Sequence, residues 1–77
     1  MEMKKFIENF ADQFDEIKEN EITPSTEFKG IAEWSSLQAL SVIAMCDEEY
    51  EVEIKGDDIR NATTIEDLYN IVKSRAK

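Results

Sequence analysis

Two adjacent hydroxyl residues, Ser35 and Ser36, have the type and position to support covalent chemistry. They lie in the stretch EWSSLQAL, directly before an apolar run with helical spacing. Gln38 follows Ser35 by three residues, the spacing of a capping box in which Ser35 is the N-cap. Ser36 would then open the helix, beside free backbone N–H groups and the positive end of the helix dipole, a position that favours a bound or attached phosphate. The alternative is that both serines only shape the start of the helix, as Ser often does.

The composition excludes most other chemistry. The chain of 77 residues has no histidine, which removes the usual general base and the His-dependent nucleophiles. Its one cysteine, Cys46, leaves zinc without a ligand set, and Gly30 and Gly56 are too far apart for a loop that cradles phosphates. The acidic clusters lack the ligand spacing of an EF-hand, so a weakly calcium-responsive protein is a remote alternative. We therefore expect no enzyme, no catalytic residue and no metal site.

The charge of the chain indicates what kind of partner it meets. Nine Lys and Arg stand against eighteen Asp and Glu, a net charge of −9. A chain this acidic repels nucleic acid and anionic membrane surfaces, so its partners should present basic patches. The chain has no apolar run long enough for a bilayer, MEMKKFIENF is unlike a secretory signal, and one cysteine allows no internal disulfide. We expect a cytoplasmic monomer with no stable membrane insertion.

An amphipathic helix and a long connection precede the serines. Apolar residues at three- and four-residue spacing predict that this helix runs from Met3 to Ile17. The segment 20–33 breaks the period and contains the one proline of the chain. Trp34, next to the serines, is interpreted as an anchor in the core rather than as an exposed contact for a partner. We expect three more apolar residues to anchor the connection: Ile22, Phe28 and Ile31.

A second helix is predicted from Ser36 to about Tyr50. It is apolar over so much of its circumference that it must be central to the core or partly a contact surface. We interpret the run EVEIKGDD as an extended connection, because the chain offers its two alternating apolar residues no strand to pair with. Asp57 or Asp58 can then cap a short helical turn.

The last segment, TTIEDLYNIVKSRAK, predicts a final helix. Thr63 precedes Glu66 by three residues, which is again the spacing of a capping box. Amphipathic helices of this kind can bury their apolar stripes only against one another. The sequence therefore predicts an all-α fold in one domain, residues 1–77: a small four-helix bundle with three main helices and a short third helix.

Taken in order, these segments resemble an acyl carrier protein, the small acidic four-helix module that carries acyl groups on a phosphopantetheine arm. The resemblance covers nearly the whole chain and includes the acidic, aromatic exit DEEYEVEI from the second helix. The attachment motif of the family is Asp-Ser-Leu, and the matching residues here are Ser35, Ser36 and Leu37. The resemblance thus places the 4′-phosphopantetheine on Ser36. The chain departs from the family at Ser35, where Asp is usual, and at Gln38 and Ser41, which are neutral where acids are common.

The resemblance implies a function. A phosphopantetheinyl transferase would attach the arm from coenzyme A, and the arm would hold an acyl or aminoacyl group as a thioester. The carrier would move this cargo between acyl-activating or acyl-transferring enzymes with basic docking patches. Ser35 preserves a helix cap but removes a negative charge, which indicates a specialised pathway of lipid or secondary-metabolite biosynthesis with its own partners.

The resemblance also implies residues for the arm, the acyl pocket and the partner surface. The acids expected on the partner surface gather late in the second helix. For most of the apolar candidates, ordinary core packing is the alternative interpretation. For the chain as a whole, the alternative is an acidic adaptor that keeps the carrier fold and whose Ser36 is never modified. The candidates are Leu37, Leu40, Ala44, Asp47, Glu48, Ile54 and Ile59.

Overall fold

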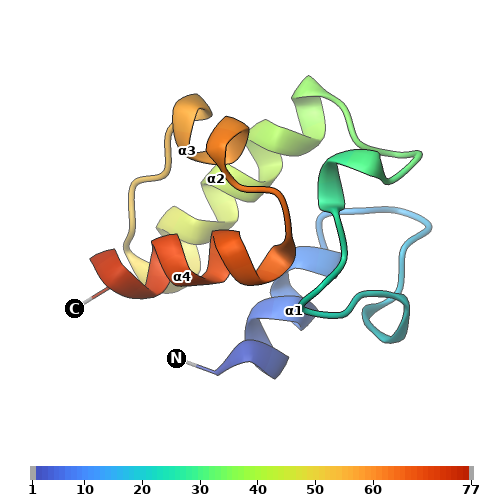
Figure 1. Cartoon of the computed structure of the whole chain (residues 1–77), viewed down its shortest axis with the longest axis horizontal. Coiled ribbons are helices and arrows are strands. Elements are labelled where there is room, and N and C mark those ends of the chain that lie inside the picture. Colours follow the sequence, from blue (N-terminus) through green and yellow to red (C-terminus); the bar gives the residue numbers. More distant parts are fainter. Residues whose placement is uncertain (1, 77) are drawn as a thin grey trace.

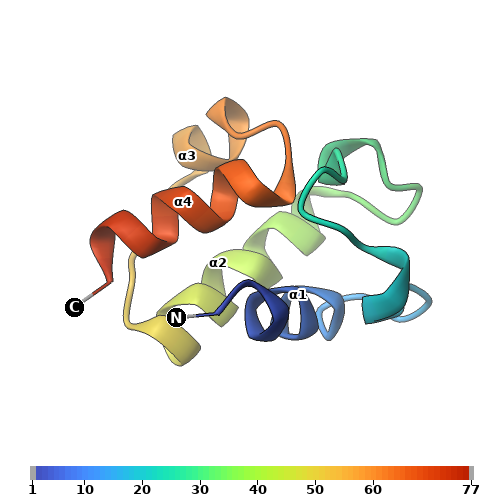
Figure 2. The same cartoon turned by 60° about the horizontal axis from the view of Figure 1, so that its bottom comes forward.

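The computed structural model describes residues 2–76 and consists of helices and connections, with no β-strand among those residues. Figure 2 shows α2 running diagonally between α4 and α1, and Figure 1 shows α3 above α4 and joined to its start by a loop. The predicted all-α fold of four helices, one of them short, is confirmed. The four α-helices are α1 (Met3–Ala11), α2 (Ser36–Tyr50), α3 (Gly56–Asn61) and α4 (Ile65–Arg75), and two single 3-10 turns, η1 (Glu19–Glu21) and η2 (Phe28–Gly30), lie between α1 and α2.

The first helix is shorter than its apolar period predicts. It ends at Ala11 instead of Ile17, although Phe14 beyond its end is buried. The chain tightens there, because the N–H groups of Gln13 and Phe14 donate to carbonyls three residues back, at 3.1 and 3.0 Å. The prediction was wrong because the apolar spacing continues through a turn that keeps the same face inward.

A side chain far along the sequence completes the end of α1. The carboxylate of Glu33 accepts the N–H of Asp15 at 3.2 Å and that of Glu16 at 2.8 Å. These two amides would bond within the helix if it continued to residue 17. Instead, they tie the exit of α1 to the segment just before α2.

The core contains residues of every helix and of the connections before and after α2. Ile22 and Phe28 are buried and Ile31 is partly buried against them, so the predicted anchors of the first connection are confirmed. One buried polar side chain within residues 2–76, Asn9, donates from Nδ2 to the Tyr50 hydroxyl at 2.9 Å and ties α1 to the end of α2. The largest fully buried residues are Phe6, Phe10, Phe28, Val42, Cys46, Val52, Ile54, Ile65, Leu68 and Val72.

The second helix ends at Tyr50, as predicted, through a left-handed residue. Glu51 has φ 55°, and the next N–H, of Val52, donates to the Cys46 carbonyl at 3.3 Å. Glycine is the usual residue at this position of a helix end, so the glutamate found here gives no sequence signal that the helix stops. Beyond it the chain is extended, as predicted, and Val52 and Ile54 are each 2% exposed.

The short third helix is capped by one of its own residues. It begins at Gly56, and the carboxylate of Asp58 accepts the N–H of Lys55 at 2.9 Å. Of the two predicted caps the structure selects Asp58, but as the third helical residue and not as the residue before the helix. Arg75, at the end of α4, donates to both Asp58 oxygens at 2.7 and 2.8 Å and to the Glu53 carbonyl at 3.2 Å. This contact joins the end of α4 to the start of α3.

The contact between Asp58 and Arg75 predicts a pH dependence. The hydrogen bonds from Arg75, followed by that from the Lys55 amide, lower the pKa of Asp58 from 3.8 to about 2. A lowered carboxyl pKa stabilises the fold above the unfolded value and loses that effect as the pH falls toward the folded one. We expect the melting temperature of the wild type to exceed that of Asp58→Asn at neutral pH, and the difference to close between pH 3.8 and about 2.

Thermal unfolding followed by circular dichroism at several pH values checks this prediction. Asp57→Asn is the matched control, because Asp57 pairs with Arg60 in a contact whose side chains are 80% and 79% exposed. An exposed ion pair contributes little to stability, so this variant should follow the wild type. A difference for Asp58→Asn that stays constant down to pH 2 would contradict the assignment.

The cap of α4 lies one residue beyond the predicted one. Thr64, not Thr63, accepts the N–H of Asp67 through its hydroxyl at 3.2 Å. The Asp67 carboxylate in turn accepts the N–H groups of Thr64 and Thr63 at 3.1 and 3.0 Å. In this register Ile65 is fully buried, and the amides of Ile65 and Glu66 donate to carbonyls of the long connection at 3.0 and 2.9 Å. Contacts with that connection therefore decide between two caps of equal spacing.

Candidate functional site

The two serines divide into a cap and a free hydroxyl, as the sequence predicts. Ser35 is extended, and its Oγ accepts the N–H of Gln38 at 3.3 Å. The reciprocal half of the capping box is missing, because Gln38 Oε1 is buried with no partner among residues 2–76. Ser36 is the first residue of α2 and is exposed. Within the part of the chain that the structure describes, its hydroxyl makes no hydrogen bond.

The surroundings of Ser36 suit a phosphate ester. The first N–H groups of an α-helix have no acceptor within the helix, and the dipole adds partial positive charge at the same end. A phosphodiester on Ser36 Oγ would bring its negative charge to this end of α2, where it is stabilised. Because Ser35 already provides the cap, such a group would displace no hydrogen bond that holds the helix.

One side of α2 faces solvent and changes character along its length. Near Ser36 it is apolar, since Leu37 and Leu40 are 70% and 62% exposed and Ala44 is exposed as well. The same side continues to the exposed acids Asp47 and Glu48. With a rise of 1.5 Å per residue, these acids lie about 16–18 Å along the axis from Ser36. We call this surface, Leu37, Leu40, Ala44, Asp47 and Glu48, the exposed face of α2.

The opposite side of α2 belongs to the core. Val42, Met45 and Cys46 are buried there, so the predicted role of the helix as a core element is confirmed, and its other side is exposed. Of the remaining candidates, Ile54 and Ile59 are 2% and 5% exposed in the core. The structure therefore does not bring all seven candidates together: five lie on the outside of α2 and two lie inside the bundle.

Trp34 packs behind the serines in an aromatic cluster. Its ring stacks on those of Phe10 and Phe14, with centroids 6.5 and 6.3 Å apart, and meets the edge of Phe28 at 5.1 Å. The prediction that Trp34 anchors the long connection is confirmed. The cluster also shows why Phe14 is buried after α1 has ended: it packs against the residue that leads into the serines.

Glu33, the residue that precedes Trp34, has a role that its sequence context does not predict. Its two carboxylate oxygens hold the amides of Asp15 and Glu16 at 3.2 and 2.8 Å. These contacts span 18 and 17 residues, and a glutamate in an acidic chain carries no local signal that it accepts backbone amides. Only the folded arrangement identifies it.

The chain has no reactive thiol of its own at the described surface. Cys46 is fully buried in α2, and burial raises its pKa to about 12. A thiol becomes a good nucleophile only as the thiolate, so Cys46 is inert at neutral pH.

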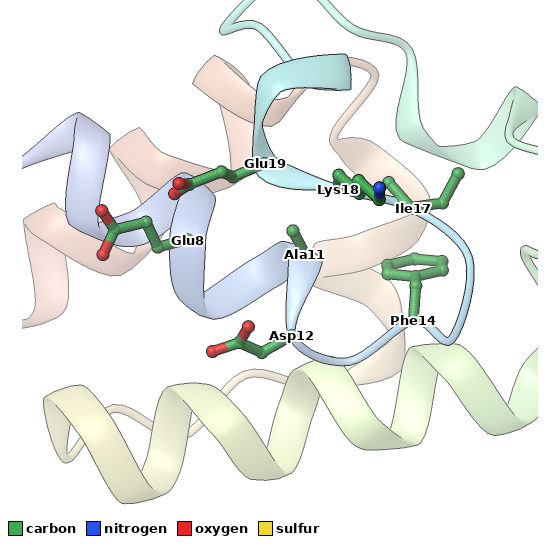
Figure 3. A pocket seen from close by; sticks show the side chains of 7 residues that line it. All are labelled: Glu8, Ala11, Asp12, Phe14, Ile17, Lys18 and Glu19. Carbon is green, nitrogen blue, oxygen red and sulfur yellow. The ribbon is translucent and has the colours of Figure 1, made fainter.

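Two surface hollows lie along α1, away from the serines. They share Glu19, and neither is lined by Ser36 or by another residue of α2. The larger hollow, of about 590 Å³ (Figure 3), is lined by Glu8, Ala11, Asp12, Phe14, Ile17, Lys18 and Glu19, and the smaller, of about 430 Å³, by Met3, Lys4, Ile7, Glu19, Asn20, Ile22 and Pro24.

Among residues 2–76 no group of three acids or cysteines could hold a metal ion, and no helix there is long and apolar enough to cross a bilayer.

Comparison with known proteins agrees with this geometry. A family model described as "phosphopantetheine attachment site" matches residues 4–72, nearly the whole chain. No curated protein and no solved structure matches significantly. Members of this family carry a covalently attached 4′-phosphopantetheine, work with a phosphopantetheinyl transferase and biosynthetic enzymes, and are carriers without catalytic activity of their own. The chain belongs to the family of phosphopantetheine-binding carrier proteins, as its resemblance to acyl carrier proteins indicates.

Proposed function

We propose that Ser36 bears the arm and that the protein carries an acyl or aminoacyl group between enzymes of a specialised biosynthetic pathway. The position of Ser36 supports this proposal most directly. It is exposed at the positive end of α2, while Ser35 alone caps the helix. The terminal thiol of the arm supplies the thioester chemistry. We also propose a cytoplasmic location, a compartment that keeps a lone thiol such as Cys46 reduced.

The chain contributes a nucleophile and a surface, but no base. When the arm is attached, Ser36 Oγ forms a bond to the phosphorus that bears the pantetheine, the pyrophosphate P–O bond of coenzyme A breaks, and the adenosine bisphosphate part leaves. Within residues 2–76 the Ser36 hydroxyl contacts no carboxylate or amine that could take the proton. The transferase must therefore bring the base, and the chain only has to hold Ser36 where that enzyme can reach it.

The exposed face of α2 supports a partner whose docking surface has an apolar part and a basic part. Next to Ser36 the partner should offer an apolar recess for Leu37 and Leu40, and about 16–18 Å away along the helix a basic patch for Asp47 and Glu48. Charge at the far end steers the encounter, while the apolar end contributes contact area beside the reacting serine. Association of this kind is rapid and reversible, as a shuttle requires.

Replacement of Leu37 or Leu40 by alanine tests this surface. Burying a leucine side chain is worth about 1.5–3 kcal/mol, so each variant should lower kcat/KM for the transferase by about tenfold or more. Because both side chains are mostly exposed, the melting temperature should stay near that of the wild type. The control Ile7→Ala, on α1 beside the smaller hollow, should leave kcat/KM unchanged. Equal loss in all three variants would exclude the exposed face of α2 as the docking surface.

Intact mass spectrometry tests the function itself. The protein is incubated with coenzyme A, magnesium and a promiscuous phosphopantetheinyl transferase. We expect a gain of one phosphopantetheine, localised by peptide fragmentation to Ser36. If no transferase adds the arm, one from the source organism included, the carrier proposal fails. Salt-sensitive binding to a basic partner without modification would then favour the acidic adaptor.

A further inference from the structure

Glu33 connects the exit of α1 to the segment that leads into Ser36. Its carboxylate accepts two consecutive amides, of Asp15 and Glu16, at 3.2 and 2.8 Å. Ser36 follows Glu33 by three residues, a span of at most about 10 Å of chain. The position of Glu33 therefore restricts where the start of α2 can lie relative to the end of α1.

The neighbouring contacts hold the same segment from the other side. The Trp34 ring lies against Phe10 and Phe14, and the backbone N–H of Trp34 donates to the Ile31 carbonyl at 2.9 Å. Trp34 thus fixes the apolar side of the segment, and Glu33 fixes the polar side. Together they leave the two residues before the helix little freedom.

The Glu33 contacts mainly fix the conformation of the connection, because the two amides that they bind are not buried. Asp15 and Glu16 are exposed, so water could hydrogen-bond to their amides if Glu33 were absent. A carboxylate that accepts two amides makes stronger, charge-assisted bonds than water offers, and it selects one arrangement of the connection. An arrangement selected in this way favours a role in presenting the surface next to Ser36.

We propose that Glu33 is a positioning residue for attachment of the arm: it keeps the exit of α1 and the approach to Ser36 in the one arrangement that the transferase binds. The inference rests on the proposed attachment at Ser36. When only a fraction of the carrier holds the competent arrangement, its apparent affinity falls by that fraction. Once bound, every molecule is in the same arrangement. Loss of Glu33 therefore raises KM for the carrier and leaves kcat unchanged.

Transferase kinetics with Glu33→Gln and Glu33→Ala test this inference. Gln keeps one acceptor oxygen but loses the charge, and Ala loses both acceptors. We expect KM to rise about threefold for Glu33→Gln and about tenfold for Glu33→Ala, with kcat within about twofold of the wild type. Glu27→Gln is the control, because Glu27 is an exposed residue of the same connection whose carboxylate makes no hydrogen bond within residues 2–76. It removes the same charge and should leave KM unchanged.

Amide hydrogen exchange gives a readout that a general loss of stability would not mimic. Exchange at Asp15 and Glu16 should accelerate in both Glu33 variants, while amides in the middle of α2 and α4 keep their protection. Unchanged KM in Glu33→Ala would overturn the inference, and so would an equal rise in Glu27→Gln. The attachment proposal is judged separately: if the wild type gains no arm, that proposal fails, whereas an arm on the wild type with unchanged KM in Glu33→Ala refutes only the role of Glu33.

Discussion

The Ser36→Ala variant should gain no mass when it is incubated with the transferase, coenzyme A and magnesium. Without the hydroxyl there is no oxygen to form the phosphodiester, and the adjacent Ser35 should not substitute for it. The Ser35 Oγ is held by the N–H of Gln38 and sits one residue before the helix. The loss of modification should therefore be total rather than partial, and intact mass spectrometry detects it directly.

Ser35→Ala is the matched control and should give the opposite pattern. It removes the cap of α2, which costs about 0.5–2 kcal/mol, and each kcal/mol lowers the melting temperature of a domain this small by about 4–8 °C. Ser36→Ala should keep its melting temperature, because alanine is a good residue in the first turn of a helix. An arm on Ser36→Ala, or none on Ser35→Ala at a temperature where it is folded, would refute the division of roles between the serines.

Phe28→Ala should be among the most destabilising single substitutions, although Phe28 lies in the long connection. Its ring is fully buried and packs edge-on against Phe10 and Trp34, with centroids 5.7 and 5.1 Å apart. Replacing a buried Phe by Ala costs about 3–5 kcal/mol. A domain of this size has a free energy of unfolding of roughly 4–12 kcal/mol, so the variant should lose from about a quarter to all of its stability.

Urea unfolding followed by Trp34 fluorescence and by circular dichroism measures this effect. Leu40→Ala is the control, because it also truncates a large apolar residue but one that is 62% exposed. The free energy of unfolding should fall by several kcal/mol less in Leu40→Ala than in Phe28→Ala, so the urea midpoint of Leu40→Ala should stay closer to that of the wild type. If the two variants unfolded at the same urea concentration, the long connection would not be part of the core.

Much of the fold can be predicted from the spacing of residues along the sequence. The helical period of apolar residues located α2 and α4, and the capping spacing identified Ser35 as the cap of α2. The alternating apolar residues of EVEIKGDD, which have no strand to pair with, indicated the extended connection between α2 and α3. These features depend on contacts within one turn or one face, which a linear sequence displays. Trp34 was also placed correctly as an anchor, because a large apolar ring on a small domain is seldom left exposed.

The errors share a different physical cause. The period predicts a first helix that continues to Ile17, yet the helix ends at Ala11 and Glu33 takes up the amides beyond it, 17 and 18 residues away in sequence. Thr63 and Thr64 offer caps of equal spacing, and bonds from α4 to the long connection decide between them. In each case a group from elsewhere in the fold satisfied a local donor, which no periodicity records.

By itself, the sequence determined that this protein is an acidic bundle of helices without histidine, with a serine directly after the cap of its central helix. Charge, composition and spacing suffice for these conclusions because each depends on residue type. Only the tertiary structure decided which side of α2 faces solvent, where α1 stops, and that Glu33 and Trp34 hold the approach to Ser36 from its polar and apolar sides. These depend on which distant segments meet, and that is settled by packing of the whole chain.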